Sequence, residues 1–349
     1  MTTPDNNRDA AGGERFVKPA ASADALANQA EPREGSEASA PQAVRRDNGL
    51  SGFGQRPATI REAFVKASSF LQSCDIGEAA SNAELLLQHL LGVDRTGLFF
   101  RWSEPFPAGK EEAWDELLHR KAAGEPVQYI TGEQEFYGLP FEVTPAVLIP
   151  RPETELLVEA VVRVGRGLWP AGAPLVADVG TGSGAIAVAA AAQCPSWQLL
   201  SSDISAAALA VARRNAARHG VAARIGFVEG DLLLPFIERQ VALHAVVSNP
   251  PYIAADELPA LQPEVRLYEP VTALVGGESG LEPYRRLAEQ LPQLPAMPQL
   301  VGFEVGAGQA REVAAMLGRI ADWDELTIIP DLAGIERHVL AIRKTAEKK

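Results

Sequence analysis

The chain has 349 residues and a formal net charge of −13, which allows two domains and argues against binding nucleic acid mainly through its phosphates. Cys74 and Cys194 show neither metal-ligand spacing nor a disulfide framework, so a reducing compartment is expected. No apolar run reaches the roughly eighteen residues of a membrane helix, and the N-terminus is not signal-like, so the sequence predicts a cytoplasmic protein without a membrane span.

Residues 1–56 differ in composition from the rest of the chain. They are rich in Ala, Ser, Gly, Asn and Pro and hold few large apolar side chains. Such a segment buries too little surface to offset the entropy of ordering, so it predicts a disordered tail. We assign it no function.

Residues 57–125 carry three helical patterns. Apolar side chains recur at helical spacing after Thr59, a good N-cap residue, and again in a second stretch that Gly92 is placed to end. The third stretch ends at Gly124. These stripes are typical of a packed core, and the sequence therefore predicts a small helical domain.

The pattern changes twice after this domain. Residues 126–150 are strand-like around a turn at Gly138, which predicts a β-hairpin linker. Residues 151–345 alternate seven strand-like runs with helices, so the fold class is α/β, a Rossmann-like, seven-stranded and mostly parallel sheet with helices on both faces. Ligands of such sheets bind beyond the carboxyl ends of the strands, where all the candidate site residues fall.

A glycine loop follows the first of these strands. Asp178, Gly180, Gly182 and Gly184 form the pattern D-x-G-x-G-x-G. Glycines there allow a tight turn and let a ligand approach main-chain N–H groups at a helix N-terminus. The loop does not match the dinucleotide fingerprint G-x-G-x-x-G, so a nicotinamide cofactor is disfavoured.

Acidic residues end the next two strands. Asp203 is placed to accept hydrogen bonds from both ribose hydroxyls of an adenosine, with a helix N-cap as the alternative. Asp231 is similarly placed to receive the exocyclic amine of an adenine, with Leu232 packed on the ring.

The fourth strand ends in Asn-Pro-Pro-Tyr. The side-chain carbonyl of Asn249 and the backbone carbonyl of Pro250 provide two acceptors that the prolines hold in place. Two such acceptors suit a planar –NH2 group, on which Tyr252 can stack. The pattern predicts a site that orients an amino or amide nitrogen.

The two patterns together resemble the class I S-adenosylmethionine methyltransferases that modify amino nitrogens. Further blocks narrow the resemblance to the peptide chain release factor glutamine methyltransferases, the HemK-type family; they span residues 126–143, 147–159, 268–287 and 303–310. The resemblance covers residues 57–343 and leaves the N-terminal tail outside it.

The resemblance implies methyl transfer from S-adenosylmethionine to the side-chain amide nitrogen, N5, of the Gln in the Gly-Gly-Gln loop of class I release factors. It implies that the helical domain recognises the substrate, and neither a metal nor a direct nucleic-acid substrate is expected. A monomer is expected. Carried over by position, the cofactor-binding residues are Gly180, Thr181, Gly182, Ser183, Gly184, Asp203, Asp231, Leu232 and Asn249. The substrate Gln would be bound by Asn249, Pro250, Pro251 and Tyr252, of which Asn249, Pro250 and Tyr252 would carry the chemistry.

Three questions stay open at this point. The run from Arg151 to Glu155 either lies beside the cofactor pocket, as the resemblance implies, or only begins a helix. A nucleic-acid amino methyltransferase acting on a flipped base is the nearest alternative function, against which the net charge and the lack of a Lys/Arg-rich stretch argue. A non-catalytic binding module is the other alternative, which the intact loop, Asp203 and the Asn-Pro-Pro-Tyr motif disfavour.

Overall fold

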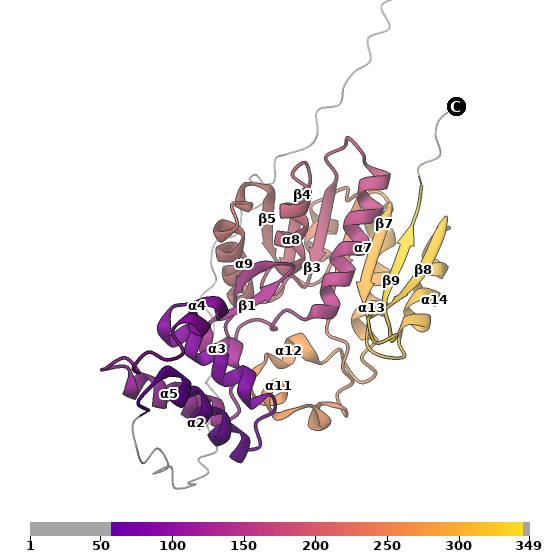
Figure 1. The fold of residues 1–349 in the computed structure, drawn as a ribbon. Coiled ribbons are helices and arrows are strands. Elements are labelled where there is room, and N and C mark those ends of the chain that lie inside the picture. The colour runs from indigo at the N-terminus through magenta and orange to yellow at the C-terminus, as the bar shows by residue number, and fades with distance from the viewer. Residues whose placement is uncertain (1–56, 345–349) are drawn as a thin grey trace, which may run out of the picture.

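The computed structural model describes residues 57–344, so the tail predicted for residues 1–56, and residue 345, lie outside the described residues. The N-terminal part is helical (Figure 1). Its helices are α2 (Ile60–Ser73), α3 (Ala79–Leu91), α4 (Arg95–Phe100), α5 (Glu111–Ala122) and α6 (Val127–Thr131). They share one apolar core, to which α2, α3 and α5 contribute buried leucines and Trp114.

Two of the predicted helix ends are confirmed. The Thr59 hydroxyl accepts a hydrogen bond from the Glu62 backbone N–H at 3.1 Å and so begins α2. Gly92 ends α3 in the left-handed conformation, with φ of 65°.

The linker differs from its prediction in its first residues. Residues 127–131 form α6 instead of a strand, because the helical spacing of Val127 and Ile130 places both side chains in the core of the helical domain. The hairpin follows, with β1 (Glu133–Phe136) and β2 (Leu139–Glu142) paired antiparallel around Gly138, as predicted.

A seven-stranded sheet forms the centre of the C-terminal part, as predicted. Its order is β5-β4-β3-β6-β7-β9-β8; β3 to β7 run parallel, and β9 is antiparallel to both neighbours. The strands are β3 (Leu175–Val179), β4 (Gln198–Asp203), β5 (Ile225–Glu229), β6 (Ala245–Ser248), β7 (Leu300–Glu304), β8 (Glu325–Pro330) and β9 (Glu336–Ile342).

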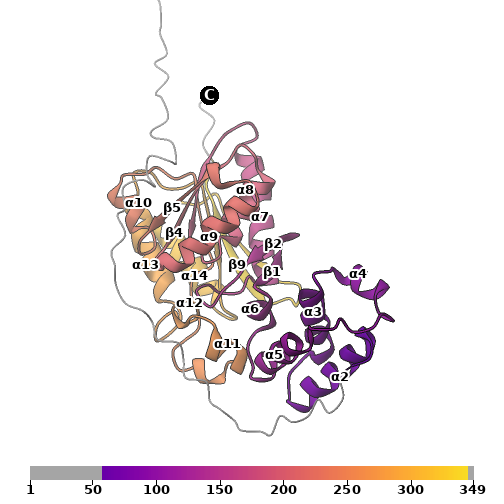
Figure 2. The same ribbon diagram turned by 90° about the vertical axis from the view of Figure 1, so that its left-hand side faces the viewer.

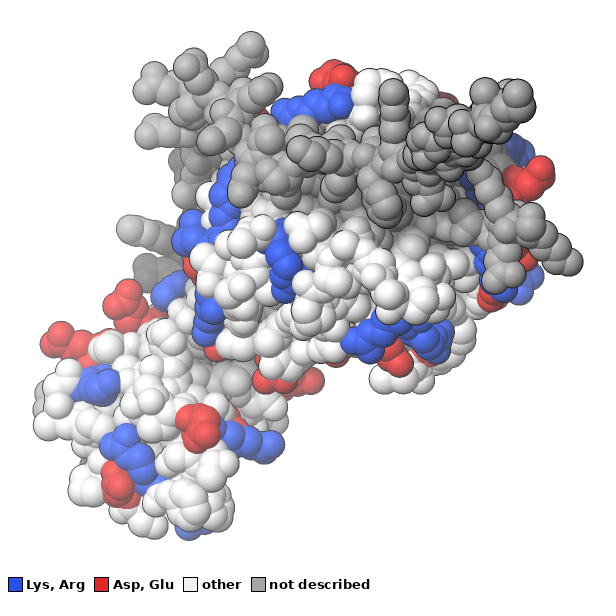
Figure 3. All heavy atoms as spheres, turned by 90° about the horizontal axis from the view of Figure 1, so that it is seen from above, with Lys and Arg blue, Asp and Glu red and all other residues white. Residues whose placement is uncertain are grey.

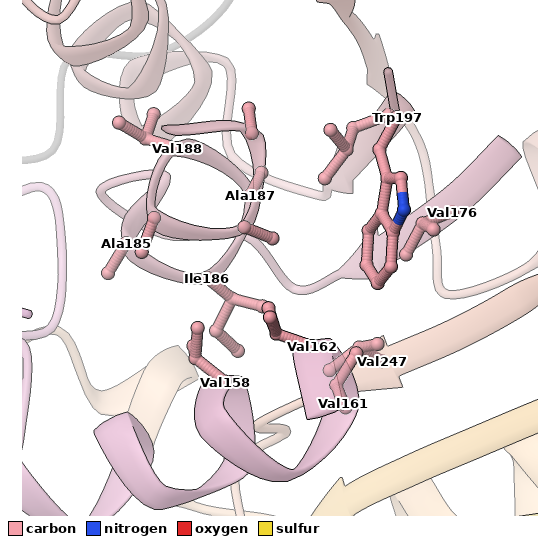
Figure 4. Packing of buried hydrophobic residues seen from close by; sticks show 14 of the residues in the cluster. Val158, Val161, Val162, Val176, Ala185, Ile186, Ala187, Val188, Trp197 and Val247 are labelled. Carbon is pink, nitrogen blue, oxygen red and sulfur yellow. The ribbon is translucent and has the colours of Figure 1, made fainter. Parts of the chain in front are cut away.

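Helices cover both faces of this sheet, because alternate strand residues are apolar on each side. One face packs against α7 (Pro152–Leu168), α8 (Ala185–Gln193) and α9 (Ala206–Arg218). Figure 4 shows Ile186 of the Ala-rich α8 pointing toward Val158 and Val162 of α7. The other face packs against α10 (Leu234–Glu238), α13 (Glu282–Gln290) and α14 (Ala310–Ile320).

The segment after β6 contacts the helical domain. Its helices α11 (Pro263–Tyr268) and α12 (Val271–Leu274) lie at one edge of the sheet, and α11 lies beside α5 (Figure 2). The buried Lys121 of α5 donates to a Glu264 carboxylate oxygen at 2.7 Å, and the Tyr268 hydroxyl donates to the Ala123 carbonyl at 3.0 Å. The helical domain is therefore joined to the segment that follows the Asn-Pro-Pro-Tyr motif.

No helix within residues 57–344 is both long and apolar enough to cross a membrane. On the face seen from above in Figure 3, basic and acidic side chains are scattered in small groups among uncharged surface, and several groups contain both.

Candidate active site

A cavity of about 450 Å³ lies at the carboxyl ends of β3, β4, β5 and β6. The chain runs outward from β3 through β4 to β5 and then returns to β6 on the other side of β3, so this edge is the topological switch point of the sheet. Most of the predicted site residues line the cavity: Gly180, Thr181, Gly182, Ser183, Asp203, Asp231, Leu232, Asn249 and Pro251.

The glycine loop forms one wall of this cavity. Gly180 and Gly182 have φ of 71° and 55°, and a Cβ added to either would meet no atom within 4 Å, so their backbones face open space. Gly184 has a different role. A Cβ there would lie 3.1 Å from the Cβ of Ala212, so this glycine allows α8 to pack closely on α9 and is not part of the cavity wall.

Asp178 supports the loop from below. It is fully buried, and its Oδ2 accepts hydrogen bonds from the Thr181 hydroxyl at 2.5 Å and from the Ala187 backbone N–H at 3.2 Å. Burial raises the pKa of its carboxyl to about 7. The side chain therefore fixes the shape of the loop and does not line the cavity.

Asp203 joins the loop to the end of β4. Its Oδ2 accepts from the Gly182 N–H and its Oδ1 from the Ser205 N–H, each at 2.9 Å. Burial raises the pKa of this carboxyl. Ser205, not Asp203, caps α9, because its hydroxyl accepts from the Ala208 N–H. A carboxylate has about four lone-pair sites, so Asp203 keeps acceptor capacity for the ribose hydroxyls of S-adenosylmethionine, and the site fits that cofactor.

Asp231 has a partner that the sequence reasoning missed. Arg286 of α13 pairs with its Oδ2, and both side chains line the cavity. Leu232 follows in the left-handed conformation, with φ of 52°, and its carbonyl accepts from the Ser202 hydroxyl at 3.0 Å. No pattern in the sequence links residues 231 and 286, because the pair forms only when α13 packs on the sheet.

The Asn-Pro-Pro-Tyr motif lies where two cavities meet. A smaller cavity of about 80 Å³ contains Asn249 and Tyr252 in its wall, and it shares Leu148, Arg151, Asn249 and Ala273 with the larger one. Burial raises the pKa of Tyr252 to about 12, so its phenol stays neutral. Pro250 is buried and lines neither cavity.

A second glycine-rich loop supports the backbone of this motif. A Cβ on Gly276 would lie 2.3 Å from the Pro251 carbonyl oxygen, and one on Gly280 would lie 2.1 Å from that of Tyr252. Gln309 also donates to the Tyr252 carbonyl at 3.0 Å. The sequence analysis did not predict this contact. Its signal in the sequence is the pair of glycines, Gly276 and Gly280, in the stretch V-G-G-E-S-G.

The run from Arg151 to Glu155 both begins a helix and reaches the cavity. Pro152 lies in the first turn of α7, so the helix-start interpretation is confirmed. Arg151 and Thr154 also line the large cavity, and Arg151 pairs with the buried Glu269.

Two family models match the chain. Residues 62–132 match the PrmC N-terminal domain, and residues 154–262 match the methyltransferase small domain. Among curated relatives, the release factor glutamine methyltransferase of Bacillus anthracis is 40% identical over 283 residues, which cover 81% of this chain and 98% of that protein. That of Geobacter sulfurreducens is 42% identical over 281 residues, which cover 80% of this chain and 95% of that protein.

Solved structures resemble the fold more distantly. The hMettl16 catalytic domain in complex with MAT2A 3'UTR hairpin 1 aligns with a TM-score of 0.50 and 16% identity, over 65% of this chain and 81% of that chain. At this identity the likeness shows the fold alone.

Proposed function

The chain belongs to the release factor glutamine methyltransferase family, and we propose that it methylates N5 of the glutamine in the Gly-Gly-Gln loop of class I release factors. As a member of this family it is a protein-glutamine methyltransferase, and its cofactor is S-adenosylmethionine. The observation that carries the proposal is the position of Asn249, which stands in the walls of both cavities. A nitrogen bound there in the smaller cavity would face the larger one.

The residues of the glycine loop and the two acidic strand ends bind the cofactor in this proposal. The backbones of Gly180 to Ser183 hold its methionine part, Asp203 accepts from its ribose, and Asp231 with Leu232 faces its adenine. When bound, S-adenosylmethionine supplies an electrophilic methyl group. The loop and Asp203 are already joined by the Gly182 hydrogen bond, so this half is formed before binding.

Asn249, Pro250, Pro251 and Tyr252 hold the substrate amide in this proposal. An amide nitrogen is a poor nucleophile, because its lone pair is delocalised into the carbonyl. The Asn249 Oδ1 accepts one of its hydrogens and places negative potential where the nitrogen becomes positive in the transition state. The Pro250 carbonyl is the second acceptor in this proposal, although Pro250 lies outside both cavity walls, so its carbonyl must become accessible when the amide binds. Tyr252 stacks on the amide plane, and Pro251 keeps the backbone rigid. The motif contains no His, Cys or Lys, which disfavours a covalent intermediate.

The smaller cavity supports an uncharged acceptor group. Leu148, Ile253, Val265 and Leu274 contribute apolar wall around Asn249 and Tyr252. Burying a charged side chain there would cost several kcal/mol of desolvation free energy. The desolvation cost of a neutral amide is small once both of its hydrogens are bonded. Arg151 is the charged residue in this wall, and it is already paired with Glu269, so the argument favours glutamine over a lysine or an acidic residue.

The test is methyl transfer from radiolabelled S-adenosylmethionine to a purified class I release factor. A release factor with Gln replaced by Ala in its Gly-Gly-Gln loop and a DNA duplex serve as parallel acceptors. We expect label on the wild-type factor alone. Label on the Gln-to-Ala factor would contradict the assignment of this glutamine nitrogen as the methyl acceptor. Label on DNA alone would favour the nucleic-acid methyltransferase alternative instead. The expected monomeric state and cytoplasmic location remain predictions.

A further inference from the structure

A buried chain of hydrogen bonds lies behind Asn249. The Asn249 Nδ2 donates to the Thr154 Oγ1 at 3.1 Å, and the Thr154 hydroxyl donates to the Glu304 Oε2 at 2.6 Å. Thr154 is 4% exposed and Glu304 is 2% exposed. The Asn249 amide also hydrogen-bonds to Glu304 and contributes to lowering its pKa against the effect of burial.

The chain has a direction, which the chemistry of Glu304 sets. An ionised carboxylate only accepts hydrogen bonds, so when Glu304 is ionised the single hydroxyl hydrogen of Thr154 points at it. The Thr154 oxygen can then only accept, and the group that it accepts from must be the –NH2 end of Asn249. The amide oxygen of Asn249 is thereby turned away from Glu304.

Resting on the proposed function, we propose that Thr154 and Glu304 are positioning residues that hold the Asn249 amide with its Oδ1, and not its Nδ2, toward the substrate amide. The two ends of an asparagine amide are nearly equal in size, so packing alone does not distinguish them. A reversed Asn249 would set its own –NH2 group against the substrate –NH2 group, where neither can accept. The substrate nitrogen would then lose the acceptor that orients it.

The fold brings these three side chains together from distant segments. Thr154 lies in the first turn of α7, Asn249 follows β6, and Glu304 ends β7. A Cβ on Gly302 of β7 would lie 3.1 Å from Val161 of α7, so the glycine lets α7 approach the strand closely. The Tyr284 hydroxyl donates to the Glu304 carbonyl at 2.7 Å and fixes the end of β7.

The test compares three variants in the release-factor methylation assay with saturating cofactor. Thr154→Val keeps the shape of the side chain and removes its hydroxyl, whereas Thr154→Ser keeps the hydroxyl. Ser248→Ala is the matched control, because Ser248 is a buried hydroxyl directly before Asn249 that donates to the Val179 carbonyl instead. The Kd for S-adenosylmethionine and the melting temperature are measured for each protein.

We expect Thr154→Val to lower kcat at least about tenfold with cofactor Kd within about twofold of the wild type. Thr154→Ser should recover most of the lost kcat, and Ser248→Ala should stay near the wild type. A Thr154→Val enzyme with wild-type kcat would overturn the proposal, as would equal losses in Thr154→Val and Thr154→Ser.

Glu304→Gln is a fourth variant, and it tests the proposal independently if Thr154→Val does not fold. A glutamine can donate to Thr154, whose hydroxyl is then free to point at the Asn249 oxygen and reverse the chain. We expect a lower kcat with unchanged cofactor Kd, and a wild-type kcat would overturn the proposal. If the wild-type enzyme does not methylate the release factor, the proposed function itself is wrong. If the wild-type enzyme and the variants methylate it equally well, only the positioning role of Thr154 and Glu304 is wrong.

Discussion

Two halves of the same sheet edge are built in different ways. The cofactor half, Gly180–Ser183 with Asp203, is held by backbone N–H groups that bond to nearby acceptors, such as Gly182 to Asp203 across 21 residues. The acceptor half, Asn249 with Thr154 and Glu304, is held by bonds between side chains, which are 95 and 150 residues apart. The first half depends on the pairing of the consecutive strands β3 and β4, and the second depends on how α7, β6 and β7 pack.

This difference implies that substitutions in the two halves affect different kinetic quantities. Backbone N–H donors remain when a side chain is substituted. A substitution in the cofactor half should therefore weaken cofactor binding only by the hydrogen bonds that the substituted side chain made. Side-chain bonds vanish with the substituted atom, and in the proposal Asn249 is the side chain that accepts from the reacting nitrogen. We therefore expect substitutions there to lower kcat and to leave cofactor binding intact.

The largest effect is expected for Asn249→Ala. The loss of an acceptor directed at the developing positive charge should lower kcat by about 10²–10³-fold, while the cofactor Kd changes by less than about threefold. Single-turnover methylation and calorimetric titration of the cofactor measure the two quantities. An unchanged kcat would remove Asn249 from the chemistry and break the distinction between the halves.

Gly280→Ala is expected to have the next largest effect. The new Cβ would lie 2.1 Å from the Tyr252 carbonyl oxygen, so the Asn-Pro-Pro-Tyr backbone must shift, and a shift near 1 Å can lower kcat by about 10²-fold. Gly138→Ala is the matched control, since Gly138 has a similar φ, 71° against 72°, but open space for a Cβ. Both variants carry the same backbone strain, and equal kcat values in the methylation assay would contradict this explanation.

In the cofactor half, Asp203→Ala is expected to raise the cofactor Kd by about 10–100-fold, which corresponds to one or two charge-assisted hydrogen bonds. With saturating cofactor, kcat should remain within about threefold of the wild type. Equilibrium dialysis with labelled cofactor and the methylation assay test both parts. A fall in kcat as large as that of Asn249→Ala would show that the halves are not separable.

The smallest predicted effect is a pH dependence of the acceptor half. Burial raises the pKa of Glu304 to about 7, and the protonated carboxyl could donate to Thr154 and reverse the hydrogen-bond chain. The ionised form is the active one, so kcat should fall as pH falls through about 7, to about a tenth of its plateau at pH 6. The charged and titratable groups around Glu304 are Glu153, Tyr252, Tyr284, Arg337 and His338.

Glu304→Gln provides the control for this pH profile. Its kcat should be low and flat between pH 6 and about pH 8, because the glutamine does not titrate. A variant that keeps the wild-type profile would assign the titration to another group, such as Asp178, whose pKa burial also raises to about 7.

Local patterns sufficed for much of the fold. The strand and helix order, the cap at Thr59 and the helix end at Gly92 follow from residues that are neighbours in the chain. The error at residues 127–131 has the same origin, since a short apolar run suits either a strand or a helical turn until its packing partners are known.

The sequence by itself predicted the cofactor half of the site and identified the Asn-Pro-Pro-Tyr motif, because the glycines, prolines and carboxylates follow directly on strands that their own local pattern indicates. Only the tertiary structure decided the pairing of Arg286 with Asp231, the contact of Gly280 with Tyr252, and the direction of the Asn249 amide. Each of these depends on side chains or backbones that meet through the order of strands in the sheet. A hydrogen bond needs atoms within about 3 Å, and no spacing along the sequence encodes that distance across 150 residues.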